Sequence, residues 1–312
     1  MIRLLAVVGP TASGKSSLAL ELASRLHSEI VSADSMQVYR GMEIGTAAPA
    51  AADLARVRHH FVSFLDPGQG FSAGAFARGA RIEVSRLNAE GKVAVVAGGS
   101  GLYLRALIDG LFDGPSADES LRARLHRQAA EAGVPELYDR LAEVDSDYAA
   151  KINPNDLRRI VRGLEVYEIT GRPLSVLHRE HRKDAEPLGA LQVGLNWPRP
   201  LLYERINARV DRMLAAGFLD EVRRLLADGH GVRLARLRSL GYREFIAHIR
   251  GECSYEQAVE TMKRNTRRFA KRQLSWFRAD ARIHWLDAGP DHPPESHIDT
   301  VLSMVADGIQ ES

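Results

Sequence analysis

The sequence predicts an α/β fold, and three observations support this class. Short apolar runs alternate with longer stretches of helical periodicity. A glycine-rich turn follows the first apolar run, and strand signals are absent between Gly110 and Pro187. Strands that alternate with helices form parallel sheets, because the connection between two parallel strands has to cross the sheet and usually does so as a helix.

The predicted strands are apolar runs that end near glycine or aspartate. They are Leu4–Val8, Glu29–Ser32, Val93–Ala97, Leu191–Leu195 and Ile283–Leu286. The strand-free middle segment reads as helices over Glu119–Ala132, Glu136–Glu143, Asp147–Lys151 and Asp156–Ile169. We therefore predict a parallel-sheet core, residues 1–112 and 188–312, into which an all-helical domain, residues 113–187, is inserted. Further helices follow one another from Leu201 to Phe277, with predicted ends at Gly217, Gly229, Gly241 and Gly251.

Composition limits the functions to consider. The chain has 312 residues, a net charge of +2 and a pI near 8.7, so nucleic-acid binding has to be argued from where the charges lie. No stretch is long enough to span a bilayer, and Leu4–Val8 is too short for a signal sequence, so we expect a cytoplasmic protein. We also expect a monomer, although no sequence feature determines the oligomeric state. The single Cys253 excludes an intramolecular disulfide and zinc sites with two or more cysteines, and we expect it to be half-buried.

The glycine-rich turn matches the Walker A pattern G-x-x-x-x-G-K-[ST]. Its residues are Gly9, Pro10, Thr11, Ala12, Ser13, Gly14, Lys15 and Ser16. The turn lies after strand Leu4–Val8 and before the helical Ser17–Leu26, as a P-loop NTPase-like core requires. Backbone N–H groups would surround a phosphate, Lys15 would neutralise it, and the Ser16 hydroxyl could ligate Mg²⁺. The pattern does not identify the ligand, because nucleotides, phosphorylated sugars and pyrophosphates present the same oxygens.

The acid that usually accompanies this loop in ATPases is missing from its expected place. Strand Val93–Ala97 runs into Gly98-Gly99-Ser100-Gly101, which offers a hydroxyl and no carboxylate. An acid follows strand Glu29–Ser32 instead, at Asp34. A residue at the carboxyl end of a parallel strand faces the ligand-binding crevice, so Asp34 could be a general base or an outer-sphere metal ligand. Its spacing is equally compatible with a turn-forming or N-capping aspartate.

Several further segments occur in a recognisable order. They are Ala33–Thr46, Gly98–Leu104, Asn155–Arg162, Gly241-Tyr242, Thr266–Gln273 and Trp276–Arg278. With the phosphate loop, they resemble the bacterial tRNA dimethylallyltransferase family, which prenylates the adenine 3′-adjacent to certain anticodons. The resemblance implies a P-loop core with a helical insertion, dimethylallyl pyrophosphate as donor, Mg²⁺ as cofactor and the adenine N6 amine as acceptor. The chain departs from the family pattern at Ser100, usually threonine, and at Ala48, commonly lysine, and it lacks the eukaryotic zinc-finger extension.

The resemblance also assigns roles near the reacting atoms. Lys15, the loop amides and Mg²⁺ held by Ser16 would stabilise the leaving pyrophosphate, which needs help because its negative charge grows in the transition state. Arg209 is a further candidate there, and its i, i+4 spacing places Arg205 on the same helical face; by spacing alone, a solvated basic face would explain both. Asp34 would accept the amine proton, and Ser100 would lie close to the reacting nucleotide.

Basic helices suggest how tRNA is held. The pairs Lys263-Arg264, Arg267-Arg268 and Lys271-Arg272 recur at helical spacing without an intervening acid, which predicts one basic face for a phosphate backbone, although a solvated surface helix is the alternative. The predicted tRNA contacts are Asp34, Ser35, Met36, Gln37, Ser100, Arg122, Arg158, Arg159, Ile160, Val161, Arg162, Lys271 and Arg272, with Arg124 as an alternative to Arg122. His59-His60 lacks visible companion ligands for a metal and is predicted to lie in a loop.

Three other functions fit parts of this pattern. A P-loop kinase of a small metabolite would share the core and could use Arg158–Arg162 as a lid. A prenyltransferase acting on free adenine nucleotides would share the donor site. Both leave the basic helix Lys263–Arg272 without a purpose, because a small acceptor does not need it. A non-catalytic nucleic-acid-binding module would explain the basic faces but not the intact Lys15-Ser16 pair.

Overall fold

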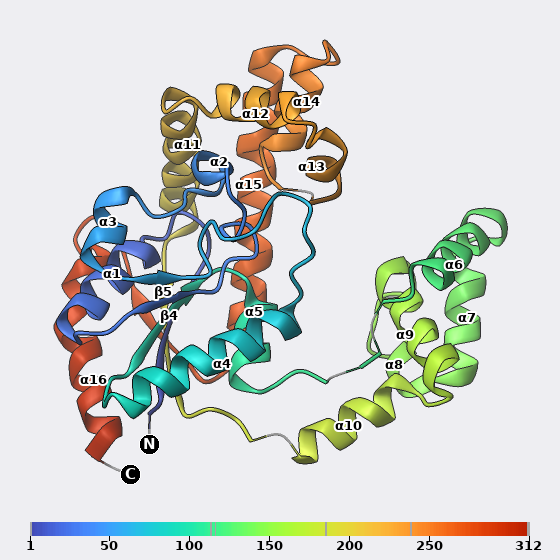
Figure 1. Ribbon diagram of the computed structural model, residues 1–312, viewed down its shortest axis with the longest axis horizontal. Helices are drawn as coiled ribbons and strands as arrows, with labels where there is room; N and C mark the ends of the chain where they lie inside the picture. The colour runs from blue at the N-terminus through green and yellow to red at the C-terminus, as the bar shows by residue number, and fades with distance from the viewer. Residues whose placement is uncertain (1, 113, 116, 185, 238, 311–312) are drawn as a thin grey trace. The chain divides into compact units, whose positions relative to one another are not determined.

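The computed structural model describes residues 2–112, 114–115, 117–184, 186–237 and 239–310. It divides into two compact units, shown in Figure 1: one comprises Met1–Ile108 and Leu188–Ser312, and the other comprises Asp109–Pro187. The second unit is therefore a continuous segment that interrupts the first. The two ends of the first unit that flank this segment are bonded to each other: the Leu188 N–H donates to the Ile108 carbonyl over 2.8 Å. The chain therefore returns to the first unit beside the point where it leaves.

A parallel sheet forms the centre of the first unit, with the strand order β3-β2-β4-β1-β5-β6. Its strands are β1 (Leu4–Val8), β2 (Ile30–Ser32), β3 (His59–His60), β4 (Ala94–Gly98), β5 (Ala190–Asn196) and β6 (Ile283–Asp287). The central β1 pairs with β4 and β5, with Leu4 opposite Ala94 and Ala190. The predicted α/β class and parallel sheet are confirmed. The prediction of a loop at His59-His60 is wrong, because these residues form a short edge strand against β2.

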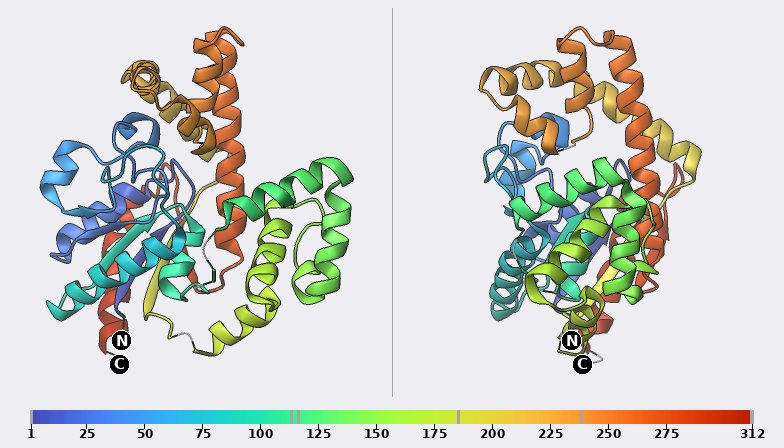
Figure 2. Two further views of the ribbon diagram at one scale, coloured as in Figure 1. Left: turned by 45° about the vertical axis from the view of Figure 1, so that its right-hand side comes forward. Right: turned by 90° about the vertical axis from the view of Figure 1, so that its right-hand side faces the viewer.

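Helices cover both faces of this sheet (Figures 1 and 2). Alternate residues of β1 point to opposite faces: Leu4 and Val8 pack with α4 (Ala73–Ala89) and α5 (Gly101–Ile108), while Leu5 and Val7 pack with α1 (Lys15–Arg25) and α16 (Ile298–Gln310). A strand buried on both faces reads as a continuous apolar run, which is why LLAVV was recognisable. Among the described residues, no helix combines the length and apolar character needed to cross a membrane.

A third apolar cluster lies beyond the sheet and joins the segment after β2 to a helical layer. The helices of this layer are α2 (Glu43–Thr46), α11 (Arg199–Ala215), α12 (Phe218–Ala227), α13 (Gly231–Leu237), α14 (Tyr242–Ile249) and α15 (Tyr255–Arg278). Two short elements lie outside this cluster: α3 (Ala51–Arg56) and the 3-10 turn η1 (Pro294–His297), which packs against α1 and α16. Val38 and Met42 pack against Phe218 and Tyr242. Gly217, Gly229 and Gly251 follow helices with positive φ, as predicted, whereas Gly241 caps the start of α14. Cys253 is half-buried, as predicted.

The second unit consists of helices around a separate core. They are α6 (Glu119–Ala132), α7 (Val134–Val144), α8 (Ser146–Ala149), α9 (Leu157–Thr170) and α10 (Leu174–Asp184). Asp118, Asp145 and Asp156 each cap the following helix through a side-chain oxygen, which explains why the helix starts were readable. The sequence analysis does not predict helix α10, whose sequence LSVLHREHRKD is mostly polar.

A buried carboxylate organises this second unit. The Glu165 side chain is completely buried and accepts bonds from Arg122 Nε (2.8 Å), Arg162 Nη1 (2.7 Å) and the Asp118 backbone N–H (2.9 Å). Burial alone would raise the pKa of Glu165, but the hydrogen bonds from Arg122, Arg162 and Asp118 outweigh it and lower the pKa. The ionised carboxylate therefore joins α9 to the start of α6.

We predict that Glu165→Gln destabilises the second unit by about 3 kcal/mol, because it removes the charge that two arginines share in a buried site. Hydrogen exchange of the α6 and α9 amides in the full chain measures this. Because the folded-state pKa of Glu165 is lowered, its stabilisation is present above the unfolded-state pKa and is lost as pH falls through the lower folded-state value. Glu143→Gln, at an exposed position on α7, is the control and should change protection little. Equal protection in the two variants would contradict the assignment.

Candidate active site

The phosphate loop joins β1 to α1 in a conformation that needs its glycines. Gly9 has φ 147° and Gly14 has φ 93°, both in the region that side chains disfavour. A Cβ atom on Gly14 would also lie 2.6 Å from Pro294 Cγ. At these two positions the loop backbone lies so close to its neighbours that only glycine fits without strain. Its amides precede the N-terminus of α1, the part of a helix that attracts anions.

Side chains from distant parts of the chain hold this loop in place. Trp197 donates its indole N–H to the Ser13 carbonyl over 2.8 Å, and Arg205 donates to the Ala12 carbonyl over 2.9 Å. The Arg205 guanidinium also stacks on the Trp197 ring, 4.2 Å from its centroid. On the other side of the loop, the Thr11 N–H donates to Gln273 Oε1 over 2.9 Å. Sequence reasoning assigned no role to Trp197 or Gln273, although Gln273 belongs to one of the family-like segments.

Three charged groups meet at the loop: Lys15, Asp34 and Arg209. The pKa of Lys15 is lowered to about 8: burial is the largest cause, the positive charge of Arg209 acts in the same direction, and the negative charge of Asp34 opposes both. Burial also lowers the pKa of Arg209, and Asp34 again opposes this. Two desolvated cations beside one carboxylate leave a positive charge that an anion would relieve. The structure thus brings the predicted Lys15, Asp34 and Arg209 into one site.

Unused hydrogen-bonding groups remain at the loop. Lys15 Nζ donates to the loop's own Pro10 carbonyl over 3.3 Å, so its other protons are available. Ser16 is exposed in the first turn of α1. The Ser13 hydroxyl is completely buried and, among the described residues, has no hydrogen-bond partner. A buried hydroxyl without a hydrogen bond lowers the stability of the fold, and its presence in the loop is consistent with a site built for a ligand.

The ends of β2 and β4 are tied together beside these charges. Ser100 Oγ accepts the Ser35 N–H over 3.0 Å and lies 3.2 Å from Ser35 Oγ. Gly98 allows this approach, because a Cβ atom there would lie 2.1 Å from the Ala33 carbonyl oxygen. Asp34 Oδ1 accepts the Met36 N–H over 2.9 Å, which is the predicted turn-forming contact. Among the described residues Asp34 Oδ2 makes no hydrogen bond, so one oxygen shapes the turn while the other stays available.

Gln37 does not present a free amide to a ligand. Its Oε1 accepts from the Ser32 hydroxyl over 2.9 Å, and its Nε2 donates to the Ala47 carbonyl over 3.0 Å. The adjacent Thr46 carbonyl accepts from Arg209 Nη2 over 3.4 Å. The predicted contact of the Gln37 side chain with tRNA is therefore not supported by its geometry, because both ends of the amide are bonded within the chain. The side chain instead fixes the segment that contacts Arg209.

The basic residues of α15 divide into two groups. Lys263 pairs with Asp211 over 2.7 Å, and Arg267 donates to Asn207 Oδ1 over 2.7 Å, both on α11. The prediction of one unpaired basic face is therefore wrong, because acids and amides from a neighbouring helix complete it. The later residues stay exposed: an open pocket of about 690 Å³ is lined by Arg105, Arg268, Lys271, Arg272, Ser275, Trp276 and Ala279. The Arg105 guanidinium lies 4.5 Å from the centre of the Trp276 ring.

The predicted tRNA contacts of the second unit also separate into two groups. Ile160 and Val161 are buried in its apolar core, so their side chains pack within the unit, and their assignment as tRNA contacts stays a prediction. Arg122 and Arg162 are bonded to Glu165, and Arg124 pairs with Glu168, so these charges are already compensated. Arg158 and Arg159 are exposed, and Arg159 lies 3.4 Å from Asp156, whereas Arg158 forms no ion pair with any acid in the described part of the chain.

His60 has companion ligands that sequence spacing did not reveal. Its Nε2 lies 2.6 Å from Glu29 Oε2, and its Nδ1 lies 3.7 Å from Glu83 Oε2. The expectation that no ligand set accompanies the histidines is therefore wrong. Arg86 already supplies positive charge to this group, since it pairs with both Glu29 and Glu83. The cluster reads as an ion-pair network that joins β3 to α4.

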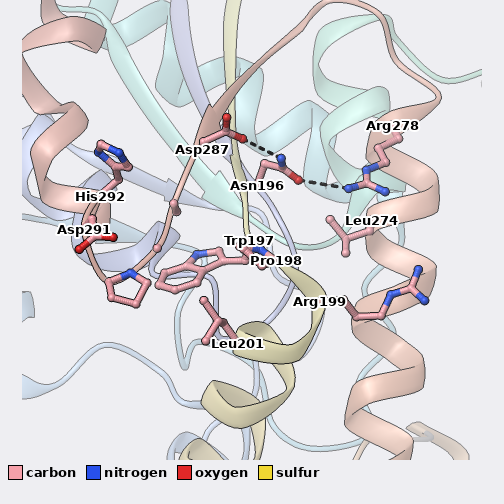
Figure 3. A pocket seen from close by; sticks show the side chains of 13 residues that line it. Asn196, Trp197, Pro198, Arg199, Leu201, Leu274, Arg278, Asp287, Asp291 and His292 are labelled. Atoms are coloured by element: carbon pink, nitrogen blue, oxygen red, sulfur yellow. Dashed lines mark hydrogen bonds between the residues drawn. The ribbon is translucent and has the colours of Figure 1, made fainter.

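A second pocket, of about 720 Å³, opens beside the ends of β5 and β6 (Figure 3). The Trp197 ring lies in its middle, and Arg199 and Arg278 lie on one side (Figure 3). Arg278 donates to Asn196 over 3.1 Å, and Asn196 donates to Asp287 over 2.8 Å. None of the predicted catalytic residues lines this pocket. It touches the phosphate loop only through Trp197, which is bonded to Ser13.

Comparison with known proteins gives matches across almost the whole chain. The curated tRNA dimethylallyltransferase of Syntrophobacter fumaroxidans is 49% identical over 286 residues, 92% of this chain and 84% of that protein. tRNA dimethylallyltransferase 1 of Pelobacter propionicus is 51% identical over 285 residues, 91% of this chain and 92% of that protein. Both alignments therefore extend far beyond the phosphate loop.

Solved structures agree with these sequence matches. The full-length tRNA isopentenylpyrophosphate transferase of Bacillus halodurans superimposes with a TM-score of 0.70 at 36% identity, covering 100% of this chain and 98% of that one. A eukaryotic dimethylallyltransferase crystallised while acting on tRNA gives a TM-score of 0.80 at 26% identity, covering 97% and 77%. The IPP transferase family model matches residues 37–280, which include the second unit and the basic part of α15. The chain belongs to the IPP transferase family.

Proposed function

We propose that this protein transfers a dimethylallyl group from dimethylallyl pyrophosphate to N6 of the adenine 3′-adjacent to the anticodon in tRNA, releasing pyrophosphate. The observation that carries the proposal is the group of Lys15, Arg209 and Asp34 at the phosphate loop, two cations for a leaving anion beside one carboxylate for a proton. Relatives about half identical to this chain bear the name tRNA dimethylallyltransferase, which supports both the donor and the acceptor.

At the leaving end, charge stabilisation is the main requirement. As the bond between the allylic carbon and the pyrophosphate oxygen breaks, negative charge accumulates on the oxygens. The loop amides, Lys15 and Arg209 bind this charge, and their fixed positions avoid reorganisation during the reaction. Because the pKa of Lys15 is about 8, the side chain carries its proton near neutral pH, as this role requires.

The residues present fit a magnesium ion. Mg²⁺ prefers oxygen ligands and keeps several waters, so one hydroxyl together with pyrophosphate oxygens meets its needs. Ser16 offers an exposed hydroxyl in the first turn of α1, and the free Asp34 oxygen is available for an outer-sphere contact. When bound, Mg²⁺ would neutralise part of the pyrophosphate charge. Protein residues then account for orientation and proton transfer.

At the attacking end, Asp34 is the base. The adenine amine is a weak nucleophile, because its lone pair is delocalised into the ring. As N6 forms its bond to the allylic carbon, one N6 proton passes to the free oxygen of Asp34, and the pyrophosphate leaves with the electron pair of the broken bond. Ser100 and Ser35 lie beside this carboxylate and hold the turn that carries it.

Exposed basic side chains supply the tRNA surface. Lys271, Arg272 and Arg268 surround the open pocket on α15, where Trp276 offers an aromatic edge next to Arg105. Arg158 and Arg159 supply positive charge on the second unit. Phosphate contacts of this kind position an RNA without reading its sequence. A loop base has to be unstacked to reach Asp34, and an unstacked base would then lie next to Ser35 and Met36. We therefore assign recognition of the adenine to this segment.

The direct test offers the protein two acceptors in parallel. We expect that with Mg²⁺ and dimethylallyl pyrophosphate the protein adds one dimethylallyl group to an anticodon stem-loop and none to free AMP, as measured by mass spectrometry. Heat-inactivated protein is the control. Modification of AMP alone would favour a nucleotide prenyltransferase. Absence of prenyl transfer to either acceptor, together with ATP consumption in a parallel reaction supplied with ATP, would favour a kinase and reject the proposal.

Replacement of Asp34 tests its role as the base. Asp34→Asn keeps an oxygen for the Met36 N–H but removes the base, so the single-turnover rate should fall by about a hundredfold or more. Inorganic pyrophosphate and the stem-loop should still bind within about threefold of the unmodified protein. Asp66→Asn, at an exposed position paired with Arg40, controls for the loss of one negative charge. An unchanged single-turnover rate would exclude Asp34 as the base.

The third prediction concerns salt dependence. Lys271→Gln with Arg272→Gln should weaken stem-loop binding and reduce the slope of log affinity against log salt by about 1 to 2, because fewer counterions are released. Arg223→Gln with Arg224→Gln removes the same charge from an adjacent exposed pair on α12 and should leave the slope unchanged. The same reduction in both double variants would mean that overall charge, and not α15, determines binding.

A further inference from the structure

Gln273 connects two loops that lie at opposite ends of the proposed reaction. Its Oε1 accepts the Thr11 N–H of the phosphate loop over 2.9 Å, and its Nε2 donates to the Gly99 carbonyl over 3.0 Å. The residue is buried in the inner face of α15. Gly99 directly precedes Ser100, so this one amide joins the donor-binding loop to the turn beside Asp34.

A side-chain amide satisfies both contacts in a single, uncharged state. One atom has to accept a hydrogen bond from the Thr11 N–H and the other has to donate one to the Gly99 carbonyl, and glutamine offers an acceptor and a donor at the end of one side chain. The Gly99 backbone also lies so close to the Gln273 amide that a side chain at position 99 would displace it, because a Cβ atom on Gly99 would lie 2.2 Å from Gln273 Nε2. Glycine at 99 and glutamine at 273 therefore depend on each other.

We propose that Gln273 is a positioning residue, which fixes the separation between the pyrophosphate-binding loop and the Gly99-Ser100 turn. It touches neither substrate and acts through the backbone of both loops. The inference rests on the proposed function for the identity of the substrates, although its geometry stands on the two hydrogen bonds alone. Lys271 and Arg272 point outwards on the same turn of α15, so the helix that would contact RNA also holds the donor loop.

The first test measures binding without chemistry. Isothermal calorimetry of the full chain with Mg²⁺ and inorganic pyrophosphate should show about tenfold weaker binding for Gln273→Leu, because the Thr11 N–H and Gly99 carbonyl lose their partner; tenfold corresponds to about 1.4 kcal/mol. Gln192→Leu is the matched control. Gln192 is also a buried glutamine of the first unit, on β5, and its Nε2 has no hydrogen-bond partner among the described residues. Its replacement should leave pyrophosphate binding unchanged.

A second variant keeps the proposal testable if Gln273→Leu does not fold. In Gln273→Glu, the carboxyl accepts the Thr11 N–H in either charge state but donates to the Gly99 carbonyl only when it is protonated. The affinity of this variant for pyrophosphate, divided by that of the unmodified protein at the same pH, should therefore fall at least about threefold between about pH 5.5 and about pH 8. A residue that merely fills space would give a constant ratio.

Transfer kinetics separate a positioning role from general damage. The KM for dimethylallyl pyrophosphate should rise about tenfold in Gln273→Leu, while the KM for the stem-loop stays within about twofold. Pyrophosphate affinity equal to that of the unmodified protein, together with a constant ratio for Gln273→Glu, would overturn the inference. If the unmodified protein transfers no prenyl group, the proposed function fails, whereas the binding comparison still decides the role of Gln273.

Discussion

Positive charge concentrated at the phosphate loop is the constraint on which the site depends. Lys15 and Arg209 are both partly buried and lie close enough for the charge of Arg209 to lower the pKa of Lys15. Such a pair is unfavourable unless an anion is near, and Asp34 provides only one negative charge. The site is therefore most stable with a multiply charged anion bound, and this stabilisation is lost when pyrophosphate leaves the protein. Binding and leaving-group stabilisation have the same physical origin.

The surrounding structure resists relaxation of this site. Trp197, Arg205 and Gln273 bind the loop backbone from two sides, and Gln37 fixes the segment whose carbonyl group contacts Arg209. Without these contacts, the loop could move to let water screen Lys15, which would weaken its interaction with a phosphate. Preorganisation of this kind is effective because the cost of ordering is met during folding and not in each catalytic cycle. Burial and hydrogen bonding together maintain the charge arrangement.

The sequence predicted the elements with strong local signals and missed those that depend on distant partners. The apolar runs of β1 and β4 and the aspartate caps of the second unit were readable, because burial and capping act within a few residues. The edge strand His59–His60 was missed because two polar residues carry no periodicity. The contacts of Gln273 join residues 262 and 174 positions apart, and no spacing rule reveals such pairs. Arg122 and Arg162 matched a family segment or a basic cluster, but only the structure shows Glu165 between them.

A charged residue near a substrate is therefore not necessarily a substrate contact, and helix α15 shows how the two roles are separated. Helical periodicity turns Ala270, Gln273 and Phe277 towards the core, and it turns Arg268, Lys271 and Arg272 outwards. Earlier in the same helix, Lys263 and Arg267 bond to Asp211 and Asn207 of α11. RNA bound at the outer residues and pyrophosphate bound at the loop would therefore both depend on where α15 lies, because Gln273 bonds the loop to the inner face of the same helix.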